Sequence, residues 1–267
     1  ITRAKWILIP YQLISLAIIV FVIYSFSQFD RTVGQNRQSL ITLGLVLITF
    51  LPKLIVTLFL FGEDVYRVFS GIITNFTGDN TTGSGSFLPD RRKFVSQIAL
   101  GTAAIPFLSL LYGMTIGKYN YKVIKQAIFF PDLPDSFDGM TITQISDIHS
   151  GSFDNPEKIQ YAIDLINEQN SDIVLFTGDI VNTHATEMHP WIDTFKKIYN
   201  PKFGKYSVLG NHDYGEYVTW TSEKDKNDNF EAIKDLHRQI DFKLLLNENI
   251  KINNGTEEIA LIGLENW

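Results

Sequence analysis

The chain contains no cysteine among its 267 residues. Disulfide bonds, zinc–thiolate sites and thiol catalysis are therefore excluded for this sequence. Without cysteines, the composition favours neither an oxidising nor a reducing compartment. Histidine is scarce, and all five histidines follow residue 116. Residues 1–116 carry nine Lys/Arg and five Asp/Glu, whereas residues 117–267 carry 14 and 24. The acidic second part argues against a nucleic-acid partner, which would favour a basic face.

Three long stretches of the first part lack charge almost entirely. Residues 6–26 and 94–116 contain no charged residue, and residues 40–61 contain only Lys53. About 20 apolar residues cross a bilayer core as a helix, so these runs predict three transmembrane helices in a membrane domain spanning 1–117. The alternative, buried helices of a soluble all-α domain, requires polar faces and breaks that such runs lack. Lys53 is costly in hydrocarbon and is expected to face the bundle interior or a water-filled kink.

The polar segments beside these runs predict an orientation. Residues 62–93 are rich in Gly, Ser and Thr and predict a flexible loop that ends in Arg-Arg-Lys at 91–93. Positive residues beside a membrane helix usually stay cytoplasmic. The following domain is therefore expected outside, on the periplasmic side of a bacterial inner membrane. Residues 91–93 also resemble an internal twin-arginine export signal, which predicts the same side, whereas three lysines between 118 and 125 oppose it.

From Tyr119 onward the pattern changes to alternating strands and helices. Asn155 followed by Pro156 predicts a helix start, with the helix running to about Gln169. The alternation predicts βαβ units with a largely parallel sheet in an α/β domain spanning 137–267, after a linker or first strand at 118–136. The β-rich runs that predict strands are 140–146, 171–177, 205–210, 242–252 and 258–266, and further helices are predicted at 189–199 and 229–240.

Polar residues follow the first three predicted strands at equal intervals. Asp147 and His149 follow the first, Asp179 the second, and Asn211 and His212 the third. The steps from Asp147 to Asp179 and from Asp179 to Asn211 are both 32 residues, about one βαβ repeat. These residues should therefore meet at the carboxyl ends of neighbouring strands, where open α/β sheets bind ligands. A divalent metal would relieve the repulsion between the two carboxylates, and mixed oxygen and nitrogen ligands suit manganese, iron, cobalt or zinc.

The motifs Asp-x-His, Gly-Asp and Gly-Asn-His-Asp, at 147–149, 178–179 and 210–213, resemble those of the calcineurin-like metallophosphoesterases. Residues 133–151 look like the membrane-anchored bacterial branch of that superfamily. The resemblance implies transmembrane helices followed by a four-layer α/β/β/α sandwich, of which this chain supplies the first half. It also implies two divalent metal ions and hydrolysis of a phosphoester or pyrophosphate bond. A phosphorylated small molecule or lipid is then the expected substrate, with the bilayer as a partner.

The same resemblance implies a role for each residue of the motifs. His212 would lie beside the phosphate as general acid or charge stabiliser. Asn182 is a candidate to orient His212, because it stands where phosphoprotein phosphatases carry an aspartate. That departure disfavours a phosphoprotein substrate. Asp213 is expected either to support the site or to cap the next turn. The implied metal ligands are Asp147 and His149 for the first ion, Asp179 for both ions, and Asn211 for the second.

The family completes its metal shell with later histidine motifs, and this chain departs from that pattern. After Asp213 it contains only His237, which is expected at the surface of a helix, so the missing ligands are expected beyond Trp267. His184 and His189 are expected to be exposed loop histidines. Two alternatives stay open: a degenerate, membrane-anchored binding or scaffold protein, and a nuclease of the same superfamily.

Overall fold

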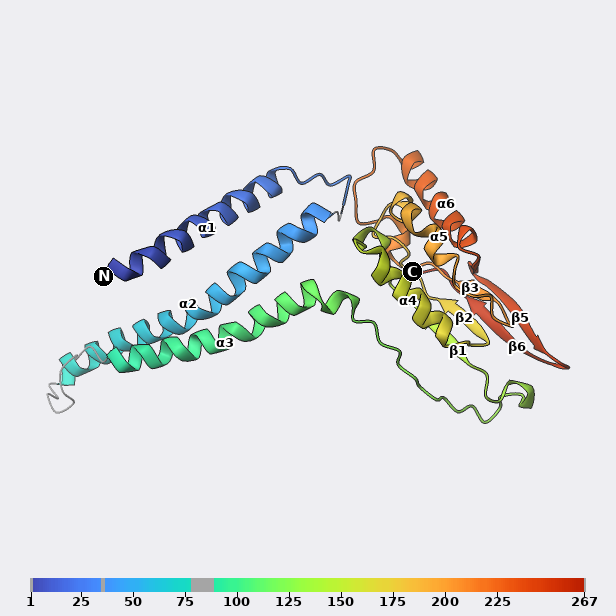
Figure 1. Ribbon diagram of the computed structural model, residues 1–267, viewed down its shortest axis with the longest axis horizontal. Helices are drawn as coiled ribbons and strands as arrows, with labels where there is room; N and C mark the ends of the chain where they lie inside the picture. The colour runs from blue at the N-terminus through green and yellow to red at the C-terminus, as the bar shows by residue number, and fades with distance from the viewer. Residues whose placement is uncertain (1, 35–36, 78–88, 267) are drawn as a thin grey trace. The chain divides into compact units, whose positions relative to one another are not determined.

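The computed structural model describes residues 2–34, 37–77 and 89–266 and divides into two compact units (Figure 1). The first unit ends at Asn120, close to the change of composition at residue 117. The second unit begins at Tyr121 and also includes the connector Phe29–Arg37, which joins the first two helices. The charge pattern of the sequence did not indicate this assignment of the connector.

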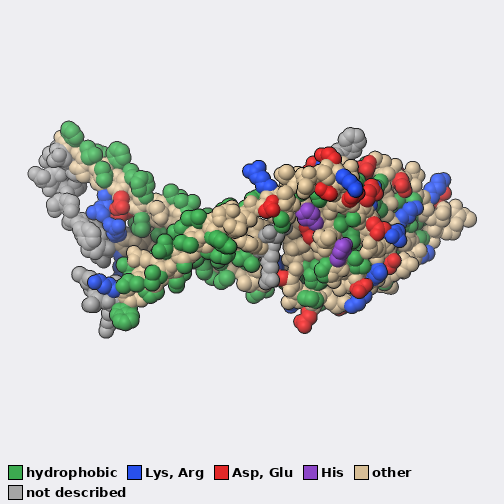
Figure 2. All heavy atoms as spheres, turned by 90° about the horizontal axis from the view of Figure 1, so that it is seen from above, with side chains coloured by type: hydrophobic (Ala, Val, Ile, Leu, Met, Phe, Trp, Pro, Cys, Tyr) green, Lys and Arg blue, Asp and Glu red, His purple; other side chains and the backbone are tan. Residues whose placement is uncertain are grey.

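Three long helices make up the first unit: α1 (Thr2–Ser27), α2 (Arg37–Thr77) and α3 (Pro89–Thr115). All three are long and apolar enough to cross a membrane, judged by length and composition. Large apolar side chains point outward from each helix, and Trp6 is 85% exposed; Figure 2 shows these side chains as a green surface. An apolar surface of this extent suits lipid rather than water, and the three predicted helices are confirmed.

The prediction of a loop at 62–93 is wrong at both ends of that segment. Residues 62–77 continue α2, and α3 begins at Pro89 instead of residue 94. Glu63 lies one helical turn from Arg67, with 4.0 Å between Oε1 and Nε, a spacing that supports helix. Proline at a first helical position has a preorganised φ. The rest of the predicted loop, residues 78–88, lies outside the described residues.

Lys53 faces another helix of the first unit. Its Nζ donates a hydrogen bond to Ser15 Oγ of α1 at 3.0 Å and lies 5.2 Å from the centre of the Tyr11 ring. A cation in a membrane-spanning segment needs such polar or aromatic partners. The bundle-facing alternative for Lys53 thus agrees with the structure.

A parallel four-stranded sheet organises the second unit, in the order β1-β2-β3-β4. Its strands are β1 (Ile142–Ile145), β2 (Ile173–Phe176), β3 (Lys205–Ser207) and β4 (Lys243–Leu244). Consecutive strands are connected through α4 (Pro156–Glu168), α5 (Ile192–Phe195) and α6 (Glu223–Gln239). The predicted βαβ order is confirmed.

Helix boundaries follow local capping. Asn155 accepts the Lys158 N–H and Pro156 occupies the first position of α4, so the predicted start is confirmed. Ser222 caps α6 in the same way through the Asp225 N–H, so α6 begins earlier than the predicted residue 229. The helix predicted at 189–199 is reduced to a 3₁₀ turn followed by the single turn of α5.

The central strand β2 is buried on both faces of the sheet. Ile173 packs with Phe137 and Ile252 on the side of the antiparallel hairpin formed by β5 (Glu248–Asn254) and β6 (Glu257–Gly263). On the opposite face, Phe176 stacks against His237 of α6 with 5.4 Å between ring centres. Alternate residues of a strand face opposite sides, so β2 separates a helix layer from the hairpin. This layering is consistent with the metallophosphoesterase fold that the resemblance implies.

Two further expectations differ from the structure. The run 242–252 is divided between β4 and β5 by a turn in which Asn247 has φ 53°. Of the two alternatives for residues 118–136, which are all described, the linker agrees with the structure, because they contain no strand. His237 is fully buried instead of exposed, because it shares the sheet-facing side of α6 with Ile233 and Leu236.

Candidate metal centre

The parallel register brings the ends of three strands to one level. Ile145 of β1 pairs with Phe176 of β2, which pairs with Ser207 of β3. The predicted site residues follow these ends within two to five positions. Because the strands are parallel, all of these loops leave the same edge of the sheet. The candidate site therefore lies at the carboxyl edge, as the spacing predicted.

Three of the predicted residues converge at this edge. Ligand atoms of His149, Asp179 and His212 all lie within 4.8 Å of one another. His149 Nε2 is 3.7 Å from Asp179 Oδ2 and 3.9 Å from Asp147 Oδ1. Asp179 is buried, whereas the Asp147 side chain is 66% exposed at the margin of the cluster. Imidazole nitrogens and carboxylate oxygens at this spacing fit a divalent cation. His212, expected beside the phosphate, also lies within ligand range.

The backbone at the site adopts a conformation that ordinary residues avoid. Asp147, His149 and Asp179 have φ of 54°, 46° and 60°. Such left-handed conformations are uncommon outside glycine and concentrate at functional sites. Two hydrogen bonds hold them: Asp147 N–H donates to the Gly178 carbonyl at 3.1 Å, and His149 N–H donates to the Asp179 carbonyl at 3.0 Å. The loops after β1 and β2 are thereby joined.

The glycines that begin the motifs at 178–179 and 210–213 allow the loops after β2 and β3 to touch. Gly178 has φ 99°, and a Cβ at this position would overlap the Gly210 backbone. A Cβ at Gly210 would overlap the Asp179 carboxylate. Only glycine leaves room for such a close approach of two backbones.

Asp213 supports both loops from within the fold. It is fully buried, and its carboxylate accepts backbone N–H groups from Asp179, Ile180 and Gly210, each at 2.9 Å. Burial raises the pKa of Asp213 to about 6, although these hydrogen bonds favour the charged form. Asp213 therefore holds the backbone of both loops that carry candidate site residues.

His212 is oriented by the main chain of Asn182. Its Nδ1 lies 2.8 Å from the Asn182 carbonyl oxygen, an acceptor, so Nδ1 carries the proton. The Asn182 side chain instead bonds Ser152, with 3.2 Å between Nδ2 and Oγ. The contact between Asn182 and His212 thus exists, but it does not depend on the side chain at position 182.

Tyr217 is a site neighbour that sequence reasoning missed. Its ring stacks on His212 with 4.4 Å between ring centres and 27° between planes. Its hydroxyl accepts a hydrogen bond from Asn211 Nδ2 at 2.6 Å. A lone tyrosine in an irregular loop carries no sequence signal for either contact. His184 is half-buried, 5.2 Å from Trp220 between ring centres, and His189 is exposed.

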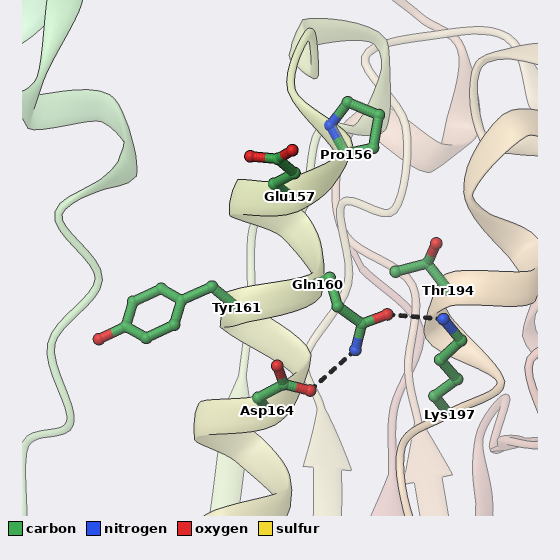
Figure 3. A pocket seen from close by; sticks show the side chains of 7 residues that line it. All are labelled: Pro156, Glu157, Gln160, Tyr161, Asp164, Thr194 and Lys197. Carbon is green, nitrogen blue, oxygen red and sulfur yellow. Dashed lines mark hydrogen bonds between the residues drawn. The ribbon is translucent and has the colours of Figure 1, made fainter.

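A shallow depression elsewhere on the second unit has different chemistry. It encloses about 420 Å³ between α4 and α5, and none of the candidate site residues line it (Figure 3). Three of its polar side chains bond one another, since Gln160 Nε2 donates to Asp164 at 2.8 Å and Lys197 Nζ donates to Gln160 Oε1 at 2.7 Å (Figure 3). Side chains that already bond one another do not by themselves indicate a ligand site.

Comparison with known families agrees with the geometry. Residues 1–118 match the family described as "Probable Calcineurin-like phosphoesterase, transmembrane domain", and residues 140–264 match "Calcineurin-like phosphoesterase". The chain belongs to the calcineurin-like phosphoesterases. Members of this family generally bind divalent metals and act as hydrolases, and the candidate metal centre of this phosphoesterase chain lies within the second match.

Individual relatives point to the same family. A "Transmembrane protein with metallophosphoesterase domain" from Danio rerio is 28% identical over 138 residues, which are 52% of this chain and 29% of the relative. The "Uncharacterized metallophosphoesterase YkuE" of Bacillus subtilis is 39% identical over 89 residues, 33% of this chain and 31% of the relative. The "UDP-2,3-diacylglucosamine pyrophosphatase LpxG" of Chlamydia trachomatis is 32% identical over 91 residues, with shares of 33% and 28%. This phosphoesterase chain spans less than a third of the length of each of these relatives.

Proposed function

We propose that this chain belongs to a membrane-anchored, metal-dependent phosphohydrolase. The observation that carries the proposal is the convergence of His149, Asp179 and His212 at the carboxyl edge of the sheet, with ligand atoms within 4.8 Å of one another. Phosphoryl transfer requires concentrated positive charge near the phosphoryl oxygens, and a cation held by this donor set would provide it.

The proposed centre holds two divalent ions, drawn from manganese, iron, zinc or cobalt. Buried Asp179 lies centrally, because its carboxylate is 3.7 Å from His149 Nε2 and also accepts the His212 N–H at 2.8 Å. When bound, the ions supply Lewis acidity and a nucleophile from water. The proposed ligands are Asp147 and His149 for one ion, Asp179 for both, and Asn211 for the other.

His212 is proposed to move a proton. Its Nδ1 is engaged by the Asn182 carbonyl, so Nε2 is the nitrogen available to the reaction. Protonated at Nε2, the imidazole donates that proton to the oxygen that leaves when the P–O bond breaks. The leaving oxygen then departs protonated, as the hydroxyl of an alcohol or of a phosphate ester, and a phosphate ester keeps the negative charge on its other oxygens.

The proposed substrate is a phosphoester or pyrophosphate of a lipid-linked or envelope molecule. The chain carries three helices able to span a membrane, and one relative is named for a pyrophosphatase of a diacylated nucleotide sugar. The catalytic unit is proposed to lie on the periplasmic side of a bacterial inner membrane, from the basic residues at 91–93. The acidic charge of residues 117–267 disfavours a nucleic-acid substrate.

Turnover by the full-length protein tests this function. We expect Mn²⁺-dependent hydrolysis of bis(p-nitrophenyl) phosphate, with kcat/KM reduced at least about 100-fold in Asp179→Asn and His212→Ala, since each removes a group that acts on the reacting phosphate. Asp235→Asn is the control, because Asp235 pairs with Arg238 on the outside of α6.

Rates that stay at the wild-type level in both variants would contradict the site assignment. A wild-type protein without turnover would favour the scaffold alternative. Preferential cleavage of DNA with Mn²⁺ would favour the nuclease alternative.

A further inference from the structure

The connector between α1 and α2 packs against the loop that follows the Gly-Asn-His-Asp motif. Thr219 N–H donates to the Arg31 carbonyl at 3.0 Å, and Gly34 lies against the Val218 side chain. Both segments belong to the second unit. The connector therefore forms part of the phosphoesterase unit, although it joins two membrane-spanning helices. Beside this contact, residues of both segments line a cavity of about 350 Å³, among them Phe29, Arg31, Glu216 and Tyr217.

Tyr217 connects this contact to the metal centre. The two residues after it, Val218 and Thr219, both touch the connector. Tyr217 itself touches two site residues, stacking on His212 and accepting the Asn211 Nδ2 hydrogen bond. A displacement of the loop at Val218 would therefore move Tyr217, and through it both His212 and Asn211.

The hydrogen bond to Tyr217 determines which end of the Asn211 amide can meet a cation. Nδ2 is a donor and cannot ligate a metal, whereas Oδ1 can. Because Nδ2 is engaged by the Tyr217 hydroxyl, Oδ1 is the amide atom left for the cation. Without that hydroxyl, the amide could rotate and present its NH₂ group. We propose that residues Phe29–Gly34 of the connector are a positioning element of the metal centre, acting through Tyr217 on Asn211 and His212. This inference rests on the proposed role of Asn211 as a metal ligand.

Gly34 offers a specific way to disturb the contact. It has φ 67°, and a Cβ there would lie 2.5 Å from Val218 Cγ1 and 3.3 Å from Thr183 Oγ1. Valine is β-branched with restricted χ1, so relief of the clash moves the loop. Gly255 is a matched control, since it has the same φ of 67° and nothing lies within 4 Å of its added Cβ. Both alanine variants carry the same backbone strain, and only Gly34→Ala carries the clash.

The experiment measures Mn²⁺ affinity of the full-length protein by titration calorimetry, together with kcat/KM. Loss of a group that orients a metal ligand typically weakens metal affinity 10–100-fold. We therefore expect roughly tenfold weaker Mn²⁺ binding in Gly34→Ala and Tyr217→Phe, with Gly255→Ala unchanged. Adding Val218→Ala to Gly34→Ala removes the 2.5 Å contact and should restore most of the affinity. Tyr217 is 59% exposed, so Tyr217→Phe opens no core cavity.

Hydrogen exchange gives a second measurement that does not depend on metal. The Thr219 amide, bonded to the Arg31 carbonyl, should exchange at least about tenfold faster in Gly34→Ala than in Gly255→Ala if the contact opens. Wild-type Mn²⁺ affinity in both Gly34→Ala and Tyr217→Phe would overturn the inference while leaving the proposed function intact. A wild-type protein that neither binds Mn²⁺ nor hydrolyses phosphoesters would overturn both.

Discussion

His237 is a polar residue that the fold uses as core. Its side chain is fully buried, and among the described residues neither ring nitrogen has a hydrogen-bond partner. It packs on Phe176 of the central strand. Burial lowers the pKa of His237 to about 3, because the charged imidazolium has no partner there. The residue therefore stays neutral over the physiological range.

This burial predicts a loss of stability in acid. An unfolded His237 takes up a proton below its ordinary pKa of 6.5, whereas the folded protein does so only near 3. Protonation of His237 therefore leaves the free energy of unfolding unchanged above pH 6.5 and lowers it as the pH decreases from 6.5 toward 3. At pH 5 this loss is about 2 kcal/mol, from 1.4 kcal/mol per pH unit. We expect His237→Leu to flatten the fall of Tm between pH 6.5 and 5, measured in detergent.

His189→Ala is the control for that measurement, because His189 is exposed. Its Tm should follow the wild-type pH dependence. An unchanged slope in His237→Leu would show that other groups cause the acid sensitivity.

Some residue positions could be predicted from the sequence and others could not. Strand spacing determines where the loops leave the sheet, so it predicts one shared edge for Asp147, His149, Asp179, Asn211 and His212. His237 was misplaced, since a histidine beside Ile233 and Leu236 reads as a polar residue at the margin of an apolar face. Tyr217 was missed because its contacts depend on the path of an irregular loop.

At the scale of elements, Asp213 ties together the loops after β2 and β3. Oδ2 accepts the N–H groups of Asp179 and Gly210, and Oδ1 accepts that of Ile180. A single carboxylate thus satisfies three backbone donors near the site. Carboxylate oxygens, which only accept, suit this role better than any neutral side chain.

Asp213→Asn should therefore loosen both loops. Its NH₂ group would replace one acceptor and leave at least one of the three N–H groups unsatisfied, at a cost of about 1–3 kcal/mol. We expect a lower Tm together with weaker Mn²⁺ binding, measured by thermal unfolding and calorimetry. Asp193→Asn, in the short helix α5, provides a comparison outside the site and should change neither quantity. Wild-type values in Asp213→Asn would show that the loops do not depend on these bonds.

The boundaries of helices and strands could be predicted where a local sequence signal marks them, and not where tertiary packing determines them. The cap at Asn155 and Pro156 predicted the start of α4, and alternation predicted the strands. The Gly- and Ser-rich sequence after residue 77 predicts a loop for the whole segment from residue 62, although residues 62–77 keep the helical spacing of apolar residues. The break between β4 and β5 depends on a left-handed turn at Asn247, which a continuous β-rich run conceals.

At the scale of the whole molecule, the composition of the two units differs in the way a bilayer and water require. Apolar side chains cover α1, α2 and α3, whereas the second unit has a buried core around β2. The change in charge near residue 116 predicted this division, because hydrocarbon excludes charge over about 20 residues. The connector at 29–37 was not predicted to join the second unit, since its role depends on contacts distant in sequence.

The absence of cysteine permits a direct test of orientation. Tyr161→Cys adds a thiol on α4, where Tyr161 is 51% exposed. If the catalytic unit lies outside, a membrane-impermeant maleimide should label this thiol in intact cells with a permeabilised outer envelope. Lys93→Cys, at the opposite end of α3, should be labelled only after the inner membrane is opened. The reverse pattern would place the catalytic unit in the cytoplasm.

The left-handed backbone at Asp147, His149 and Asp179 has a consequence for protein engineering. Each such residue costs of order 1 kcal/mol relative to glycine. A redesign that selects only for thermal stability would therefore favour glycine or asparagine at these three positions. Since all three side chains belong to the candidate metal centre, optimising this fold for heat resistance alone would select against its ligands before it altered the core.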